Sequence, residues 1–163
     1  MLTLPTLVER PAQPYVAIHE KVTIPFTPVI DKVMPEVAGW LQARGVERFG
    51  PAVFKYNVID MPRLEVEMGF APAAPLTGAG RVLAGVLPAG RYATLTHWGH
   101  YDRLIDATAV LIGWAKETGI TWDSSAAADG EHFVSRFELY PNGPMDTPDP
   151  EKWETQIFIK VRG

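Results

Sequence analysis

The sequence predicts an α+β fold in which a β-α-β-β unit occurs twice in tandem. We expect an antiparallel sheet with two helices on one face and a central cleft between the halves. Two amphipathic helical stretches carry the prediction, because each ends in the same way and is followed by an aromatic strand, a turn with proline and a final strand. The shared helix ends are Trp40…Gly45-Val46 and Trp114…Gly119-Ile120.

The first half begins with two strand candidates, residues 2–9 and 15–22, separated by a segment with two prolines that interrupts the pairing. Residues 28–44 have the apolar spacing of a helix, with Pro35 predicting a bend and Gly45 a stop. The apolar stripe of this helix is Ile30, Val33, Met34, Val37, Trp40 and Leu41.

A hairpin of strands 52–59 and 64–70 follows, joined by a turn at 60–63. In its second strand, Glu65 and Glu67 alternate with apolar residues, which is typical of a sheet covered on one face only. Residues 71–80 are rich in Pro, Ala and Gly and predict a linker.

The second half repeats the order of elements. Asp102 is the expected N-cap of the second helix, and Gly119 its stop. The expected elements are strands 82–87 and 91–98, a loop at 97–102, a helix at 102–118, a polar loop at 121–130 and strands 133–140 and 155–161. We interpret the chain as a single domain, 1–163, with repeat 1 at about 1–70, a linker at about 71–80 and repeat 2 at about 81–163.

Composition excludes several classes of function. The 163 residues carry a net charge of −4 and no cluster of Lys and Arg, which argues against a nucleic-acid-binding surface. There is no cysteine for a disulfide, a thiolate nucleophile or a metal. His97 and His100 lack further ligands at metal-binding spacing, so we expect no metal, and no cofactor motif is present. Without a signal or membrane-spanning segment, the expected location is the cytoplasm.

One carboxylate stands out in the strand expected at 133–140. Alternation places Val134, Arg136, Glu138 and Tyr140 on one face of this strand. An enclosed carboxylate beside a tyrosine suits a cation or a reacting ligand, whereas an exposed face would make Arg136 and Glu138 an ordinary surface pair. The residues alone leave both interpretations open.

Short motifs along almost the whole chain resemble the GyrI-like, or effector-binding, domain superfamily. This superfamily includes the drug-sensing domains of AraC- and MerR-type multidrug regulators, and stand-alone proteins described as gyrase inhibitors or small-molecule binders. The matching motifs are Glu9-Arg10-Pro11-Ala12-Gln13-Pro14, Phe49-Gly50-Pro51-Ala52 with Tyr56, Leu87-Pro88-Ala89-Gly90-Arg91-Tyr92, His97-Trp98-Gly99-His100-Tyr101-Asp102, Trp114…Gly119, Phe137-Glu138-Leu139-Tyr140 and Glu154-Thr155-Gln156-Ile157.

The resemblance implies that Glu138 lies at the floor of an aromatic pocket and attracts lipophilic cations. It also implies a second activity, because some stand-alone members are similar to hydrolases of electrophilic cyclopropane-bearing compounds. Two residues depart from the family pattern: Arg136 is placed to neutralise Glu138, and Gln156 stands where a glutamate is common.

These observations lead to one main hypothesis, a stand-alone multidrug-type protein that binds lipophilic, aromatic or cationic compounds around Glu138. The predicted ligand-binding residues are Glu138, Tyr56, Phe54, Trp98, Tyr101 and Tyr140. The first alternative is a hydrolase of cyclopropanoid toxins in which Glu138 is catalytic with help from Tyr140. The second is a protein-interaction module that binds gyrase or a regulator. Without a helix-turn-helix, we expect a role in transcription to act through a separate protein.

Overall fold

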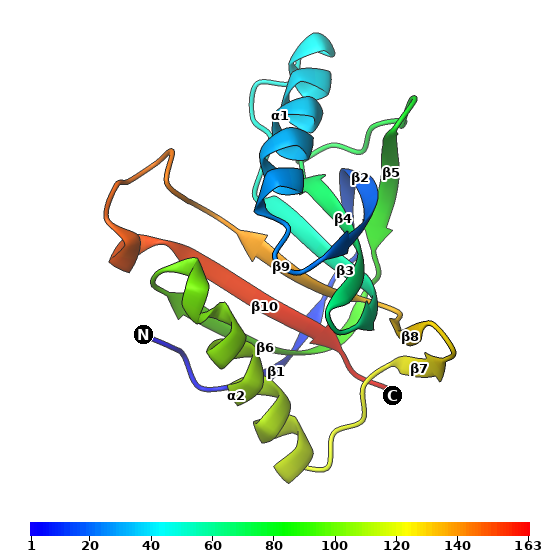
Figure 1. The fold of residues 1–163 in the computed structure, drawn as a ribbon, viewed down its shortest axis with the longest axis vertical. Helices are drawn as coiled ribbons and strands as arrows, with labels where there is room; N and C mark the ends of the chain where they lie inside the picture. Colours follow the sequence, from blue (N-terminus) through cyan, green and yellow to red (C-terminus); the bar gives the residue numbers. More distant parts are fainter.

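The computed structural model describes all residues from 1 to 163, and its two α-helices and ten strands are labelled in Figure 1. The helices are α1 (Thr27–Ala43) and α2 (Leu104–Glu117), with 3₁₀ turns η1 (Tyr101–Arg103) and η2 (Pro150–Lys152). The strands are β1 (Thr6–Arg10), β2 (Gln13–Thr23), β3 (Ala52–Asp60), β4 (Arg63–Phe70), β5 (Val82–Leu87), β6 (Gly90–Trp98), β7 (Ser124–Ala127), β8 (Gly130–Phe133), β9 (Arg136–Tyr140) and β10 (Glu154–Lys160).

All strands join one antiparallel sheet, in the order β1-β6-β10-β9-β3-β4-β2-β5, with the β7–β8 hairpin attached to β3. The units β2-α1-β3-β4 and β6-α2-β9-β10 therefore lie side by side and meet where β3 pairs with β9. The two edge strands are exchanged between the units. β1, at the start of the chain, pairs with β6 of the second unit, and β5, which precedes the second unit, pairs with β2 of the first. The α+β class and the tandem repeat predicted from the sequence are confirmed.

Both helices pack on the same face of the sheet, over different halves. Paired residues of neighbouring strands share a face. The strand register connects one such row of residues from β6 to β2. That row is Leu95, Ile157, Glu138, Phe54, Met68 and Ile18. Its first two members belong to the core that includes Leu111 of α2, and its last three to the core that includes Leu41 of α1. Figure 1 shows the helices over these two halves, with β9 and β10 running between them.

The opposite face of the sheet carries a third core. Tyr92, Phe137 and Phe158 pack edge to face or stacked, with ring centroids 5.1 to 6.2 Å apart. The guanidinium of Arg10 lies 4.5 Å from the Phe158 ring centroid, a cation–π contact that closes the edge of this core. Because both faces are covered, residues on either side of the central strands are buried.

The strand predicted at 133–140 is interrupted. It divides into β8 and β9 at Val134 and Ser135, where the chain bends. Both residues keep a backbone hydrogen bond, from the Val134 amide to Asp123 and from the Lys160 amide to Ser135. The Val134 side chain is 50% exposed, so it does not share the buried face of Glu138. Ser135 turns inward and accepts a hydrogen bond from the Tyr92 hydroxyl at 2.9 Å. Alternation across this segment therefore fails at Val134.

Two further boundaries differ from the sequence prediction. The loop expected at 121–130 contains β7, which pairs with β8 in a hairpin. Asp102 is not the N-cap of the second helix: the chain enters through η1, where His100 Nδ1 accepts a hydrogen bond from the Asp102 amide at 3.1 Å. The helix stops are confirmed, since Gly45 and Gly119 have φ of 75° and 73°, in the left-handed region that glycine tolerates. Pro35 lies inside α1.

Candidate functional site

Glu138 lies at the centre of the sheet, under two tyrosine hydroxyls. The residue is 9% exposed. Tyr56 donates a hydrogen bond to its Oε1 at 2.7 Å, and Tyr140 donates to the same oxygen at 2.6 Å. No protein group donates to Oε2. One carboxylate oxygen is therefore fully engaged and the other has no protein partner.

The two repeats place these tyrosines in matching positions. Phe54 on β3 is paired with Glu138 on β9, and each is followed two residues later by a tyrosine on the same face. Tyr56 and Tyr140 therefore reach the carboxylate from opposite sides. The pairing of β3 with β4 shifts register just after Tyr56, between Tyr56 and Val58. The seam between the repeats thus creates the hydrogen-bond arrangement around Glu138.

Burial dominates the electrostatics of the site. It raises the pKa of Glu138 above its ordinary value, while the hydrogen bonds from Tyr140 and Tyr56 and the charge of Arg136 oppose the rise. Arg136 forms no ion pair within 4 Å; its guanidinium lies 4.9 Å from the Phe133 ring centroid. Burial also lowers the pKa of Arg136. The surface Arg136–Glu138 pair that the sequence left open is therefore absent, and Arg136 acts on Glu138 only at a distance.

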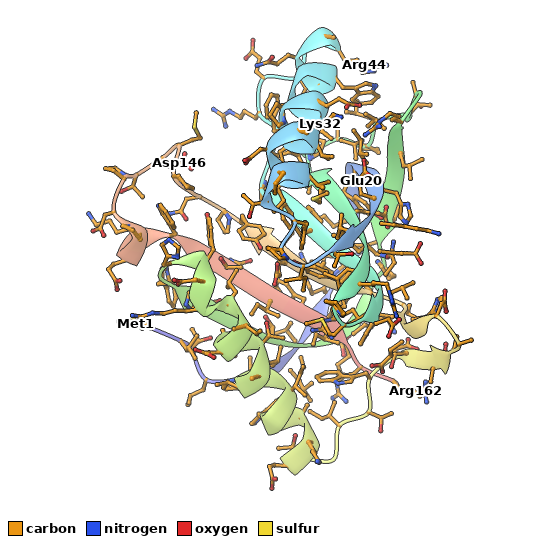
Figure 2. All side chains as sticks on the ribbon, viewed as in Figure 1. Met1, Glu20, Lys32, Arg44, Asp146 and Arg162 are labelled. Carbon is orange, nitrogen blue, oxygen red and sulfur yellow. The ribbon has the colours of Figure 1, made fainter.

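A chain of aromatic rings leads outward from Glu138. Tyr140 contacts Phe54 and Tyr101, with ring centroids 5.2 and 5.6 Å apart. Tyr101 stacks on Trp153 at 4.9 Å, with an interplanar angle of 28°. Tyr101 belongs to η1 and Trp153 precedes β10, so two separate connections cover the site. Figure 2 labels Asp146 in the loop that leads toward Trp153 and projects from the sheet.

Five of the six predicted ligand-binding residues gather here: Glu138, Tyr140, Tyr56, Phe54 and Tyr101. Trp98 does not. It lies three residues beyond Leu95, so alternation along β6 places it on the opposite face from Glu138. The sequence interpretation overlooked Trp153, although an aromatic residue directly before the last strand was a usable signal.

A second buried carboxylate provides an internal contrast. Glu67 on β4 was expected on an uncovered face, yet it is 9% exposed, because the third core covers that face. Tyr15 donates to its Oε1 at 2.7 Å, and Asn57 donates to its Oε2 at 2.6 Å. Lys55 Nζ lies 3.7 Å from Oε2. Glu67 thus has both oxygens bonded and a cation beside it, whereas Glu138 has neither.

Other features of the surface lie apart from Glu138. A groove of about 460 Å³ opens near the β3–β4 turn, and its lining includes Lys21, Arg63 and Asp129 but no member of the Glu138 cluster. No group of three or more His, Cys, Asp or Glu side chains is arranged to hold a metal ion. Neither helix is long and apolar enough to cross a membrane.

Two β-α-β-β units that enclose an acidic group among aromatic rings at their seam define a domain of the small-molecule-binding class. The family model of the GyrI-like small molecule binding domain matches residues 4–162, and the chain belongs to this family. No sequence among the curated proteins matches the chain.

Solved structures share the fold at low sequence identity. The C-terminal domain of EcmrR is 21% identical with a TM-score of 0.73, covering 97% of this chain and 96% of that one. In a cryo-EM structure of an EcmrR–DNA complex, the match has 19% identity and a TM-score of 0.74, over 99% of this chain but only 57% of the EcmrR chain. SAV2435 bound to tetraphenylphosphonium is 13% identical, with a TM-score of 0.58 over 99% and 95% of the chains. A hydrolase from Listeria innocua is 13% identical, with a TM-score of 0.60 over 98% and 92%.

Proposed function

We propose that the chain binds lipophilic aromatic cations, with the positive charge placed against Oε2 of Glu138. The observation that supports this most directly is the uneven use of the carboxylate. Two tyrosines hold Oε1 in a fixed position, while Oε2 has no protein donor and no cation within ion-pairing distance. A buried carboxylate gains most from a partner that neutralises it. A ligand cation supplies that partner.

The aromatic rings around Glu138 suit the rest of such a ligand. Tyr140, Tyr101 and Trp153 offer ring faces to aromatic groups and to a delocalised positive charge. All three are only partly buried, so the aromatic contacts that begin at Glu138 reach the surface of the protein. Entry of a ligand requires the Tyr101–Tyr140 contact to open.

The contrast with Glu67 argues against a purely structural carboxylate. A structural acid in a sheet needs its oxygens bonded, and Glu67 meets that need with Tyr15, Asn57 and Lys55. The same fold therefore provides a complete set of partners for one buried acid and an incomplete set for the other. The bound tetraphenylphosphonium of SAV2435, which shares this fold, is a ligand of the chemical type proposed here. EcmrR, whose C-terminal domain shares this fold, forms a complex with DNA, and we propose a regulatory context for this chain as well.

Calorimetric titration with tetraphenylphosphonium tests the proposal, with tetraphenylborate as a ligand of the same shape and opposite charge. We expect wild type to bind the cation and not the anion. Glu138→Gln keeps the size of the side chain and an acceptor for the tyrosines, and we expect it to weaken cation binding about tenfold or more. Glu9→Gln removes an exposed charge on β1 and serves as the control. Equal binding of both ions, or an unchanged affinity in Glu138→Gln, contradicts the proposal.

One observation favours a second candidate function, hydrolysis of electrophilic cyclopropane-bearing compounds. The pKa of Glu138 is raised, and its free oxygen is placed to accept a proton from water beside two tyrosine hydroxyls. In that reaction the water oxygen bonds to the strained ring carbon, the carbon–carbon bond breaks, and the proton held by Glu138 passes to the carbon that leaves. Product formation that is lost in Glu138→Gln and reduced in Tyr140→Phe, with binding retained, supports the enzyme. If neither binding nor turnover depends on Glu138, a protein-interaction role through the outer surface gains support.

A further inference from the structure

Two buried polar atoms have no hydrogen-bond partner, and they belong to neighbouring residues. His97 on β6 is 3% exposed and Thr155 on β10 is fully buried, yet His97 Nδ1 and Thr155 Oγ1 are both unpaired. The two residues are directly paired in the β6–β10 ladder, so their side chains project from the same face at adjacent positions. All other fully buried side-chain nitrogen and oxygen atoms of the protein have partners.

This pair lies beside the aromatic cluster. Glu138 is paired with Ile157, and Thr155 is two residues before Ile157 on the same face. That diagonal relationship places Glu138 and Thr155 about 7–8 Å apart across the sheet. Because β9 and β10 are antiparallel, two residues after Glu138 and two residues before Ile157 lie at the same level of the sheet. Tyr140 and Thr155 are those residues. The unpaired atoms therefore lie next to the tyrosine that covers Glu138.

One edge of the His97 ring faces Gly99. A Cβ placed on Gly99 would come within 3.3 Å of both Cε1 and Nε2 of His97, so this edge of the imidazole lies against the loop backbone. Gly99 has a φ of 145°, a conformation that favours glycine. The Cε1–Nε2 edge of the ring thus lies beside Gly99, while Nδ1 is buried without a protein partner on the face that His97 shares with Thr155.

The local charge favours an oxygen acceptor at this position. Burial, together with the N-terminal ammonium and Arg103, lowers the pKa of His97, and Glu151 opposes the shift. The imidazole is therefore neutral at pH 7, in surroundings with more cationic than anionic groups. A neutral imidazole nitrogen and a hydroxyl can both donate, and leaving them unpaired costs stability. An acceptor on a ligand would satisfy both at once.

We propose that His97 and Thr155 form a hydrogen-bonding subsite for a carbonyl or similar uncharged oxygen of the ligand whose cationic end lies at Glu138. The inference rests on the proposed function and specifies its ligand class: an aromatic cation with an acceptor oxygen a few bonds from the charge. The Tyr101–Trp153 stack covers this end of the site, since Trp153 is two residues before Thr155.

A matched pair of ligands tests the subsite in the full chain. (4-Oxopentyl)triphenylphosphonium carries a ketone three methylene groups from phosphorus, and (4-methylpentyl)triphenylphosphonium has a methyl group in place of that oxygen. We expect wild type to prefer the ketone at least about fivefold, since one hydrogen bond is worth about 1 kcal/mol and the ketone oxygen can accept two. Thr155→Val and His97→Leu should abolish the preference and retain binding of the methyl compound, whereas His97→Asn, which keeps a polar atom near the Nδ1 position, should retain part of it.

Thermal unfolding without ligand gives an independent readout. Because the Thr155 hydroxyl is unpaired, Thr155→Val should leave the melting temperature unchanged or raise it. A fall of about 2–4 °C or more would mean that the hydroxyl has a structural partner, and would overturn the subsite. Equal binding of the two phosphonium ions by wild type, with Glu138→Gln still weakening both, overturns the subsite and leaves the proposed function standing. Failure of wild type to bind either ion overturns both.

Discussion

Phe54 and Glu138 face each other directly across the β3–β9 pair, at the boundary between the two repeats. On one side of this pair the row of side chains continues into the core under α1, and on the other into the core under α2. One repeat thus supplies an aromatic ring and the other an acid at the same level of the sheet. The charged group is placed where neither helix covers the sheet with its own apolar stripe.

The tyrosine hydroxyls should control the ionisation of Glu138. Their hydrogen bonds oppose the rise in pKa that burial causes. Replacing Tyr140 or Tyr56 with Phe removes one donor and keeps the ring, so we expect each variant to raise the pKa of Glu138 further and the double variant to raise it most. Carbon-13 NMR of the glutamate carboxyl groups, titrated in wild type and variants, measures the effect. A Glu138 pKa that is unchanged in the double variant would show that the hydrogen bonds do not stabilise the ionised form.

Glu138 should also make the ligand-free protein less stable as the pH rises. Because its pKa is higher in the folded protein than in the unfolded chain, the folded state binds the proton more tightly. Stability is therefore lost as the pH rises from the ordinary glutamate value through the raised one. Glu138→Gln removes this dependence, so we expect the variant to be the more stable above the raised pKa.

Urea unfolding of both proteins across a pH series measures this difference. The gain in unfolding free energy from Glu138→Gln should grow with pH and disappear below the ordinary pKa of glutamate. Glu9→Gln, at an exposed position, controls for the change in net charge. A gain that is constant with pH would mean that proton binding at Glu138 is not its source.

The sequence predicts the architecture well, because helix periodicity, glycine stops and the alternation in β4 are local signals. Where the structure differs from the sequence prediction, the cause is packing between segments that are distant in the sequence, or the side of a strand on which a residue lies. The burial of Glu67 depends on a third core formed by strands distant in sequence, which no local alternation reveals. Trp98 is an aromatic residue in a matching motif, but side chains alternate along β6, and Trp98 therefore lies on the sheet face opposite to Glu138. The repeat and strand alternation point to Tyr56, Phe54 and Tyr140, and the family resemblance singles out Glu138. Their role in ligand binding stays a prediction.

Because the strand is interrupted at Val134, substitutions at Val134 and at Phe137 should differ strongly in their effect on stability. Val134 is 50% exposed, whereas Phe137, three residues later, is fully buried among Tyr92 and Phe158. We expect Val134→Thr to change the free energy of unfolding by no more than about 0.5 kcal/mol. Phe137→Ala should cost about 3–5 kcal/mol, through the cavity it leaves. Denaturant unfolding at one pH compares them, and a large cost at Val134 would indicate that 133–140 forms one buried strand after all.

Removing the neighbouring cation should destabilise the protein more at Glu67 than at Glu138. Lys55 lies 3.7 Å from Glu67 and is held by Asn57, so Lys55→Met leaves a buried carboxylate without its ion pair. We expect a loss of about 3 kcal/mol in unfolding free energy at neutral pH.

Arg136 has no ion pair with Glu138, and its guanidinium contacts the Phe133 ring. Arg136→Met keeps an apolar contact with that ring, so we expect a smaller loss together with a higher pKa of Glu138. Unfolding of both variants in urea tests this, and an equal loss would mean that Arg136 is a direct partner of Glu138 and that the acid is not free to bind a ligand cation.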